Sequence, residues 1–284
     1  MTAPIPPAEA RRGRRRAALL VILVIVVSAA AGFGIWAIVR GATASSVTLR
    51  DPVKREIAME IVASAENSTL AWYDRYDYIE DIGDERGYTG GLVGFTSGTR
   101  DVLMLVERYT EEVPGNALAA YLPALRAVDG TDSHEGLGAE FEEAWRAEAA
   151  HEGFQQAQRD EVARLYLDPA VDQALADGLG VLGQFTYFDA MVMHGDSGFA
   201  SIREQALDTE DSPVDGGDEA AFLGAFLDAR VVEMRREAAH EDTSRIDTAQ
   251  RVFLDEGNFG LEVPLRWSVY GDPYEILRDP TSRW

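Results

Sequence analysis

The sequence has no cysteine and little histidine. Because cysteine is absent from all 284 residues, disulfides, thiolate metal sites and a cysteine nucleophile are excluded, although an oxidising compartment is not. The four histidines never occur in the His-Glu-x-x-His spacing of a helix-borne zinc site. We therefore predict neither a metal site nor a cofactor.

Basic residues are also scarce. The chain has 26 Lys and Arg against 49 Asp and Glu, a formal charge of −23, and six of the basic residues but one acid lie in the first 40 positions. Residues 41–284 therefore hold 20 basic and 48 acidic side chains, a charge of −28. Such a surface repels nucleic acid and anionic lipid and attracts a cationic polymer. Acidity is most often a solubility feature, so it supports a cationic ligand without establishing one.

One uncharged run, residues 17–39, is long enough to cross a bilayer as a helix. Arginines cluster in the basic tail before it, residues 1–16, and only Arg40 follows it directly, so the positive-inside rule predicts that the remainder is exported. The run exceeds the usual length of a cleavable signal, which favours an uncleaved signal-anchor. A cleaved signal peptide stays open, because 29–31 and 42–44 offer small-residue cleavage sites. Either alternative predicts an extracellular protein.

After a polar linker at residues 40–51, helical periodicity dominates the chain. The predicted helices cover 52–66, 72–79, 102–109, 117–128, 137–150, 153–167, a new helix from Asp168-Pro169, 179–194, 218–239 and 242–256. Glycine-bearing loops are expected at 195–198 and 208–217, and an irregular segment at 258–284.

The one predicted sheet is a small twisted hairpin at residues 88–96, where β-prone residues are interrupted by glycines. Glycine in a strand lets another backbone or a ligand approach closely. The fold class is therefore mainly α, of the α+β type, with no internal repeat.

Two carboxylates stand out near this hairpin. Glu66 lies at the end of a helical pattern, and Asp84 lies on a glycine-bounded loop. Because they come from two elements, they can face each other, as two-carboxylate acid/base chemistry requires. For a single Glu at a helix end, a solvated surface carboxylate is the ordinary interpretation.

Several segments along the chain together resemble one known family. They are Ala65-Glu66-Asn67-Ser68, Gly83-Asp84-Glu85-Arg86-Gly87-Tyr88-Thr89, Gly94-Phe95-Thr96-Ser97-Gly98, Tyr187-Phe188-Asp189-Ala190, Phe226-Leu227-Asp228-Ala229-Arg230, His240-Glu241-Asp242-Thr243-Ser244-Arg245 and Tyr270-Gly271-Asp272-Pro273-Tyr274. Spread in this order, they resemble the chitosanases of glycoside hydrolase family 46. The resemblance implies a lysozyme-like fold, with two helical lobes and a small sheet flanking a substrate cleft. It covers a catalytic domain at 52–276 and leaves the C-terminal extension, 277–284, without a role.

The resemblance also implies a mechanism. Glu66 corresponds to the general acid, Asp84 to the general base and Thr89 to a residue that helps to hold the attacking water. The reaction inverts the anomeric centre, so the two carboxyl groups should lie about 6.5–9.5 Å apart. Glu66 must then keep its proton while Asp84 stays ionised. Without the resemblance, Thr89 is equally well an ordinary β-branched strand residue.

Three further residues, Asp189, Arg230 and Arg245, match an ion network that supports the site in this family. Asp189 stands in the most apolar predicted helix, where an unpaired carboxylate would be costly and an arginine partner is expected. Two interpretations stay open: the network tunes Glu66, or it only stabilises the fold.

The family match predicts the following substrate-binding residues: Asn67, Ser68, Tyr78, Arg86, Thr99, Asp101, Glu237 and His240. Of these, Asp101 and Glu237 can pair with the ammonium group on C2 of glucosamine, which N-acetylglucosamine lacks. Either acid could equally be a solvated helix residue.

The resulting hypothesis is a monomeric, endo-acting, inverting hydrolase of the β-1,4 linkages of chitosan, with no nucleic-acid partner and with membrane contact only through residues 17–39. One alternative is a lysozyme-like glycosidase that acts on peptidoglycan. Another is a membrane-anchored, non-catalytic polysaccharide-binding protein. The acidic composition argues against an anionic wall polymer.

Overall fold

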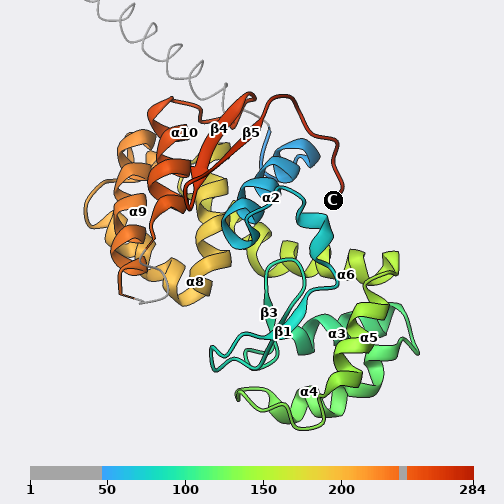
Figure 1. The fold of residues 1–284 in the computed structure, drawn as a ribbon. Helices are drawn as coiled ribbons and strands as arrows, with labels where there is room; N and C mark the ends of the chain where they lie inside the picture. Colours follow the sequence, from blue (N-terminus) through green and yellow to red (C-terminus); the bar gives the residue numbers. More distant parts are fainter. Residues whose placement is uncertain (1–46, 237–241) are drawn as a thin grey trace, which may run out of the picture. The chain divides into compact units, whose positions relative to one another are not determined.

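The computed structural model describes residues 47–236 and 242–284 (Figure 1). The predicted tail at 1–16, the predicted membrane segment at 17–39, and the candidate residues Glu237 and His240 lie outside this part of the chain. Within it, no helix combines the length and the apolar character that crossing a bilayer requires. Residues 47–284 group as one compact unit.

The last residues of the predicted linker are packed against this unit. Leu49 is fully buried, and its backbone N–H donates to Gln184 Oε1 at 2.7 Å. Arg50 pairs with Asp168 and Asp172 at 2.8 Å each. The ordered fold therefore begins before the predicted first helix.

Helix α2, Pro52–Asn67, begins where the sequence predicts. Asp51 caps its first turn by accepting from the backbone N–H groups of Val53 and Lys54, and Pro52 occupies a position where no N–H is needed. The helix ends at Ser68, which adopts the left-handed conformation with a φ of 51°. Its buried face, which includes Ile57, packs into the main core, so α2 holds its C-terminal residues on a rigid base.

A three-stranded antiparallel sheet follows a short 3-10 helix, η1 (Trp72–Arg75). Its strands are β1 (Ile79–Asp81), β2 (Tyr88–Gly90) and β3 (Phe95–Thr96), in the order β1-β2-β3. The predicted hairpin is thus present, but the prediction of a helix over 72–79 is wrong after Arg75. A Cβ on Gly90 would come within 2.8 Å of Ile79 Cδ1, so the glycine permits the close approach of β1.

Helices dominate the next hundred residues. The elements are α3 (Asp101–Glu112), η2 (Ala117–Tyr121), α4 (Leu122–Val128), α5 (Ala139–Glu148), α6 (Glu152–Val162), η3 (Ala163–Leu167) and α7 (Asp168–Ala176). Helix α7 begins at Asp168, as predicted, but Leu167 before it is already helical and no side chain caps α7, so the predicted cap at Asp168 is wrong. The π-helical turn η3 instead precedes Pro169, which has no N–H to donate.

The predicted end of the central helix at residue 194 coincides with a break in α8. Helix α8 spans Val181–Leu207, but Gly195 within it has non-helical angles, with a φ of 63° and a ψ of −179°, so two helical segments meet there. The predicted loop at 195–198 is reduced to this break. Glycine tolerates this backbone geometry without a steric penalty. The remaining helical elements are η4 (Pro213–Asp215), α9 (Glu219–Met234), η6 (Ile246–Gln250) and α10 (Arg251–Asp255). Helix α8 packs against α7 and α9.

The segment predicted to be irregular contains a second sheet. Strands β4 (Leu265–Val269) and β5 (Asp272–Ile276) form a hairpin across the turn Tyr270-Gly271, where both residues have positive φ. Leu265, Trp267 and Val269 alternate inward, which is the period of a half-buried strand. The prediction missed this alternation because it runs over only five residues.

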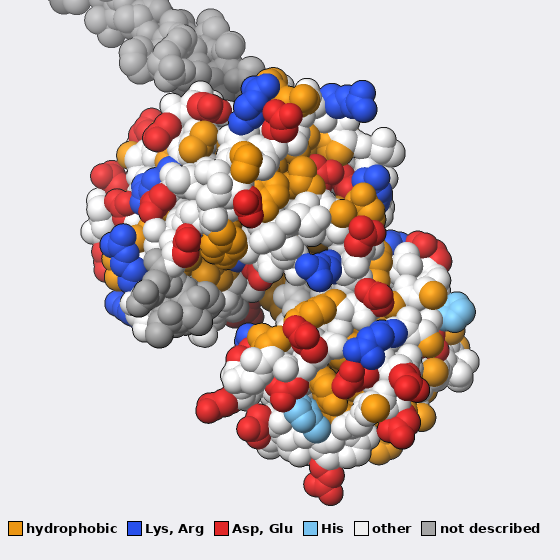
Figure 2. Space-filling view, viewed as in Figure 1, with side chains coloured by type: hydrophobic (Ala, Val, Ile, Leu, Met, Phe, Trp, Pro, Cys, Tyr) orange, Lys and Arg blue, Asp and Glu red, His pale blue; other side chains and the backbone are white. Residues whose placement is uncertain are grey.

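Two groups of elements are visible within residues 47–284 (Figure 1). One contains the sheet β1-β2-β3 with α3, α4 and α5, and the other contains α2, α8, α9, α10 and the β4-β5 hairpin. A continuous hydrophobic core includes residues from both groups, for example Trp145 and Phe188. The surface is indented between the groups (Figure 2). The fold is mainly helical with small antiparallel sheets, as predicted.

Candidate active site

Glu66 lies in the last turn of α2, where the apolar face of the helix ends. Its carboxyl group is 30% exposed, so it is reachable from solvent while its helix is buried. Arg245 Nη1 donates a hydrogen bond to Glu66 Oε1. The candidate acid therefore has one oxygen held by a guanidinium group from a segment 179 residues away.

Arg245 is held in turn by a buried carboxylate on α8. Asp189, which is 1% exposed, accepts from Arg245 Nη2 at 2.7 Å and from Arg230 Nη1 at 2.9 Å. Gln250 donates to Asp189 at 2.6 Å and accepts from Arg230 at 3.0 Å. Burial would raise the pKa of Asp189, but the two arginines outweigh it and lower that pKa to about 2.

Asp189 contacts both guanidinium groups of this network, and Glu66 contacts Arg245. The same charges raise the pKa of Arg245, although its burial alone would lower it. Burial lowers the pKa of Arg230, against the pull of Asp189. Arg245 therefore links the buried ion pair to the candidate catalytic carboxyl group.

Asp84 lies on the loop between β1 and β2, where Gly83, Glu85 and Gly87 all have positive φ. Asp84 Oδ1 accepts from the backbone N–H of Arg86 at 3.1 Å, and Oδ2 accepts from Arg86 Nε at 2.7 Å. The Asp84 side chain is 25% exposed. A Cβ on Gly87 would lie 2.4 Å from Ser97 Oγ, so this loop needs glycine where it meets β3.

Thr89 points inward from the middle of β2, opposite Glu80 on one side and Thr96 on the other. The residue is 6% exposed, and its Oγ1 has no hydrogen-bond partner among the described residues. Buried hydroxyl groups are normally paired with protein or with an ordered water. Thr89 Oγ1 is therefore a polar atom that is free to bind a water.

Three predicted substrate-binding residues flank the sheet. The Tyr78 hydroxyl donates to Glu80 at 2.6 Å, and burial, reinforced by Glu80, raises the pKa of Tyr78 to about 12. Asp101, the first residue of α3, accepts from Thr99 Oγ1 at 3.0 Å. Burial raises the pKa of Asp101, against the hydrogen bond from Thr99, whose hydroxyl also contacts that of Thr96.

The other candidates divide between the two carboxylates. Asn67 and Ser68 follow Glu66 at the end of α2, and Arg86 pairs with Asp84 at 2.5 Å.

Among the described residues, no group of three or more His, Asp or Glu side chains could hold a metal ion.

The structure thus brings together Glu66, Arg245, Asp189 and Arg230 by direct contact, and separately Asp84 with Arg86, and Asp101 with Thr99. The sequence did not point to Gln250, a 1% exposed amide that contacts two members of the ion network. In the sequence, Gln250 is a polar residue at helical spacing from Ile246, Ala249 and Phe253, all of which are buried. This pattern could have indicated a buried polar contact at Gln250.

Comparison with known proteins identifies the family of this chain. Residues 60–265 match the model of glycosyl hydrolase family 46. The chain is 56% identical to a chitosanase from a Streptomyces species over 87% of this chain and 90% of the relative, and 55% identical to one from a Nocardioides species over 83% and 86%. A solved chitosanase co-crystallised with substrate matches with a TM-score of 0.79 and 56% identity, covering 82% of this chain and all of that one. The chain therefore belongs to glycosyl hydrolase family 46.

Proposed function

We propose that this protein is a chitosanase that cleaves β-1,4 linkages between glucosamine units within the polymer, with inversion at the anomeric carbon. Two relatives above 50% identity bear the name chitosanase, and each is matched over more than four-fifths of its length. This similarity is the observation that carries the proposal, and the contacts of Arg245 with the buried Asp189 and the partly exposed Glu66 support it.

Glu66 acts as the general acid. Arg245 occupies Oε1 and cannot accept a proton, so Oε2 is the oxygen that carries the proton toward the glycosidic oxygen. As the bond from C1 to that oxygen breaks, the proton moves to the leaving sugar and negative charge develops on Glu66. Arg245 is already in place to stabilise this charge, so little reorganisation is needed at the moment of reaction.

Asp84 acts as the general base. Asp84 pairs with Arg86, and each carboxylate oxygen keeps a further acceptor site for a water. The water gives its proton to Asp84 as its oxygen bonds to C1 from the face opposite the leaving group. Thr89 Oγ1, buried and unpaired among the described residues, helps to hold this water. The two carboxyl groups then lie about 6.5–9.5 Å apart.

Substrate preference follows from charge. Asp101 beside the sheet, together with Glu237, pairs with the C2 ammonium groups of glucosamine units. Asp and Glu side chains are spread over both groups of elements on the face seen in Figure 2, which supports a cationic substrate over an anionic wall polymer. Asn67, Ser68, Tyr78, Arg86, Thr99 and His240 complete the proposed contacts. An extracellular, monomeric enzyme stays our expectation.

The first test is an NMR time course of the purified protein on highly deacetylated chitosan, which records the anomeric form of the first new reducing ends. We expect the α-anomer. If the β-anomer forms first, inversion is wrong, and if no cleavage occurs, the proposed activity is wrong.

The second test replaces the two carboxyl groups. Glu66→Gln and Asp84→Asn should each lower kcat/KM by about 10²–10⁴-fold, because each removes a proton-transfer group while keeping the side-chain shape. Circular dichroism melting provides the folding control. Wild-type activity in either folded variant would contradict the assigned roles.

A further inference from the structure

Residues 277–284, which we call the strap, follow β5 and run back beside α2 (Figure 1). Its last two residues contact two elements at once. Arg283 contacts Glu56 of α2 and stacks over the Tyr73 ring of η1, with 4.0 Å between its Cζ and the ring centroid. Trp284 packs against the Trp72 ring at 5.9 Å. The strap therefore joins α2 to η1.

The contact with Glu56 satisfies a fully buried carboxylate. Glu56 is 0% exposed, its Oε2 accepts from the backbone N–H of Arg283 at 2.7 Å, and its Oε1 accepts from Trp72 Nε1 at 2.9 Å. Arg283 Nη1 lies 3.6 Å from Oε1. Since a buried carboxylate without a charged partner is costly, loss of the Arg283 guanidinium would weaken the compensation of Glu56, although the backbone N–H of residue 283 would still donate to it. Glu56, Trp72 and Arg283 thus form one interdependent cluster.

Trp284 has a similar role for a half-buried cation. The Arg55 guanidinium lies over the Trp284 ring, 4.8 Å from its centroid, and Arg55 Nε has no hydrogen-bond partner among the described residues. Burial lowers the pKa of Arg55. The aromatic face of Trp284 therefore offers a stabilising cation–π contact at this point of α2.

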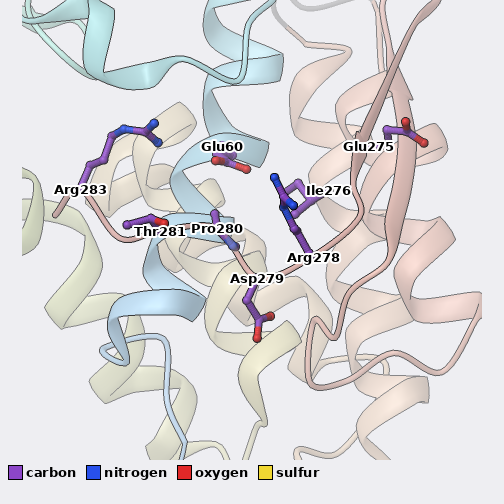
Figure 3. Close-up of a pocket in the computed structure, with 8 residues that line it drawn as sticks. All are labelled: Glu60, Glu275, Ile276, Arg278, Asp279, Pro280, Thr281 and Arg283. Carbon is purple, nitrogen blue, oxygen red and sulfur yellow. The ribbon is translucent and has the colours of Figure 1, made fainter.

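The strap leaves a cavity of about 300 Å³ against α2, lined by Glu60 and by strap residues that include Arg278 and Arg283 (Figure 3). In this view the two arginines lie on either side of Glu60. Glu60 is one helical turn beyond Glu56, so the strap follows the same face of α2 toward its C-terminal half.

We propose that Arg283 and Trp284 are positioning residues for the reaction: by clamping η1 onto α2, they set the place of the β1-β2 loop with Asp84 relative to Glu66. Asp84 follows Glu66 by 18 positions, and Trp72 lies between them in the sequence. Trp284 packs against Trp72, so the clamp formed by Arg283 and Trp284 holds the middle of this segment. Neither strap residue is among the substrate contacts proposed above. The inference rests on the roles proposed above for Glu66 and Asp84.

The consequence is a specific kinetic signature. An inverting reaction needs a water-sized gap between the two carboxyl groups, and small misplacements of catalytic groups cost rate steeply. Loosening the clamp should therefore lower kcat more than it raises KM, because the proposed sugar contacts at Thr99 and Asp101 lie outside the segment that the clamp positions.

The test uses Trp284→Ala and Arg283→Gln, with Trp284→Phe and Arg283→Lys as conservative variants that keep the ring or the charge. Arg278→Gln is the matched control, because it removes a strap charge that does not contact Glu56. All are assayed on chitosan well below their melting temperatures. We expect kcat to fall about threefold or more in the first two, with KM within about twofold, and to recover in the conservative pair. An unchanged kcat, or an equal loss in Arg278→Gln, overturns the proposal.

A second measurement is independent of activity. Amide hydrogen exchange in Trp284→Ala should be faster than in wild type over residues 52–79 and unchanged over residues 101–148. Unchanged exchange over 52–79 overturns the clamp. Faster exchange with unchanged kcat overturns the positioning role. If the wild-type protein does not cleave chitosan, the proposed function fails, and exchange still reports on the clamp separately.

Discussion

Arg245 contacts two carboxyl groups of different burial, Asp189 and Glu66. The inward contact is shielded from water and the outward one is partly exposed, so the same side chain ties the core to the candidate acid. This geometry favours neither of the two interpretations left open by the sequence over the other, because a stabilising pair and a catalytic support need the same contacts.

Arg245→Gln separates this buried contact from an ordinary surface pair. Asp189 would lose one of two guanidinium partners inside the core, so we expect unfolding free energy to fall by about 3 kcal/mol in urea titrations. The matched control is Arg251→Gln, whose partner Asp228 is 75% exposed and which should cost about 0–1 kcal/mol. Equal losses in the two variants would contradict a special role for the buried network.

Thr89→Val tests the unpaired hydroxyl. The substitution keeps the shape of the side chain and breaks no hydrogen bond among the described residues, so the melting temperature should not fall. If Oγ1 holds the attacking water, kcat should fall about 10-fold or more. Thr96→Val, on the partner strand, is the comparison for a hydroxyl that already has a partner. A Thr89→Val enzyme with wild-type kcat would return Thr89 to the role of an ordinary strand residue.

At the scale of elements, α2 carries charges on its buried side as well as at its end. Burial, with Glu56 adding to it and Arg283 opposing it, raises the pKa of Glu60 from 4.5 to about 7. The folded protein therefore binds a proton more tightly than the unfolded chain at this position. The stabilisation that results is present below about pH 4.5 and is lost as pH rises toward 7.

Glu60→Gln should remove this pH dependence, because glutamine stays neutral. We expect its melting temperature, relative to wild type, to be higher at pH 8 than at pH 5. Thermal melts of both proteins at the two pH values measure this, with Glu210→Gln at an exposed position as a control. A difference between variant and wild type that is the same at both pH values would show that Glu60 does not titrate in this range.

Element prediction succeeded where the pattern was long and failed where it was short. The stripe Val102, Leu105, Val106 and Tyr109 is helical and buried, as its spacing indicates. The β4-β5 hairpin was missed, because each of its strands has only five residues and so short an alternation does not stand out in the sequence. The helical path through Asp168-Pro169 was missed because the π-helical turn that accommodates the proline has no simple sequence signature.

At the scale of the whole molecule, acidity should act on substrate capture. Residues 41–284 carry a formal charge of −28, and chitosan units carry ammonium groups. Raising NaCl from 0.05 to 0.5 M shortens the screening length to a few ångströms, so KM should rise severalfold while kcat changes less. Melting curves at each salt concentration control for unfolding. A KM that does not depend on salt would mean that the acidity serves solubility alone.

The amino-acid sequence alone was enough to predict a mainly helical domain and to single out Glu66 and Asp84, because helical periodicity, caps and short motifs are local and need no knowledge of packing. It also pointed to Asp189, Arg230 and Arg245 as charges that need partners. It did not indicate that Arg245 would also reach Glu66, or that Gln250 would join them.

Those contacts were decided by tertiary structure. Arg245 and Glu66 are separated by 179 positions, and Arg283 and Glu56 by 227. Whether such side chains meet depends on how α2, α8, α9 and the β4-β5 hairpin pack, and packing sums many weak apolar contacts that no local pattern encodes. The strap shows the same point: residues 277–284 carry no motif, and only their contact with α2 and η1 makes them part of the site's support.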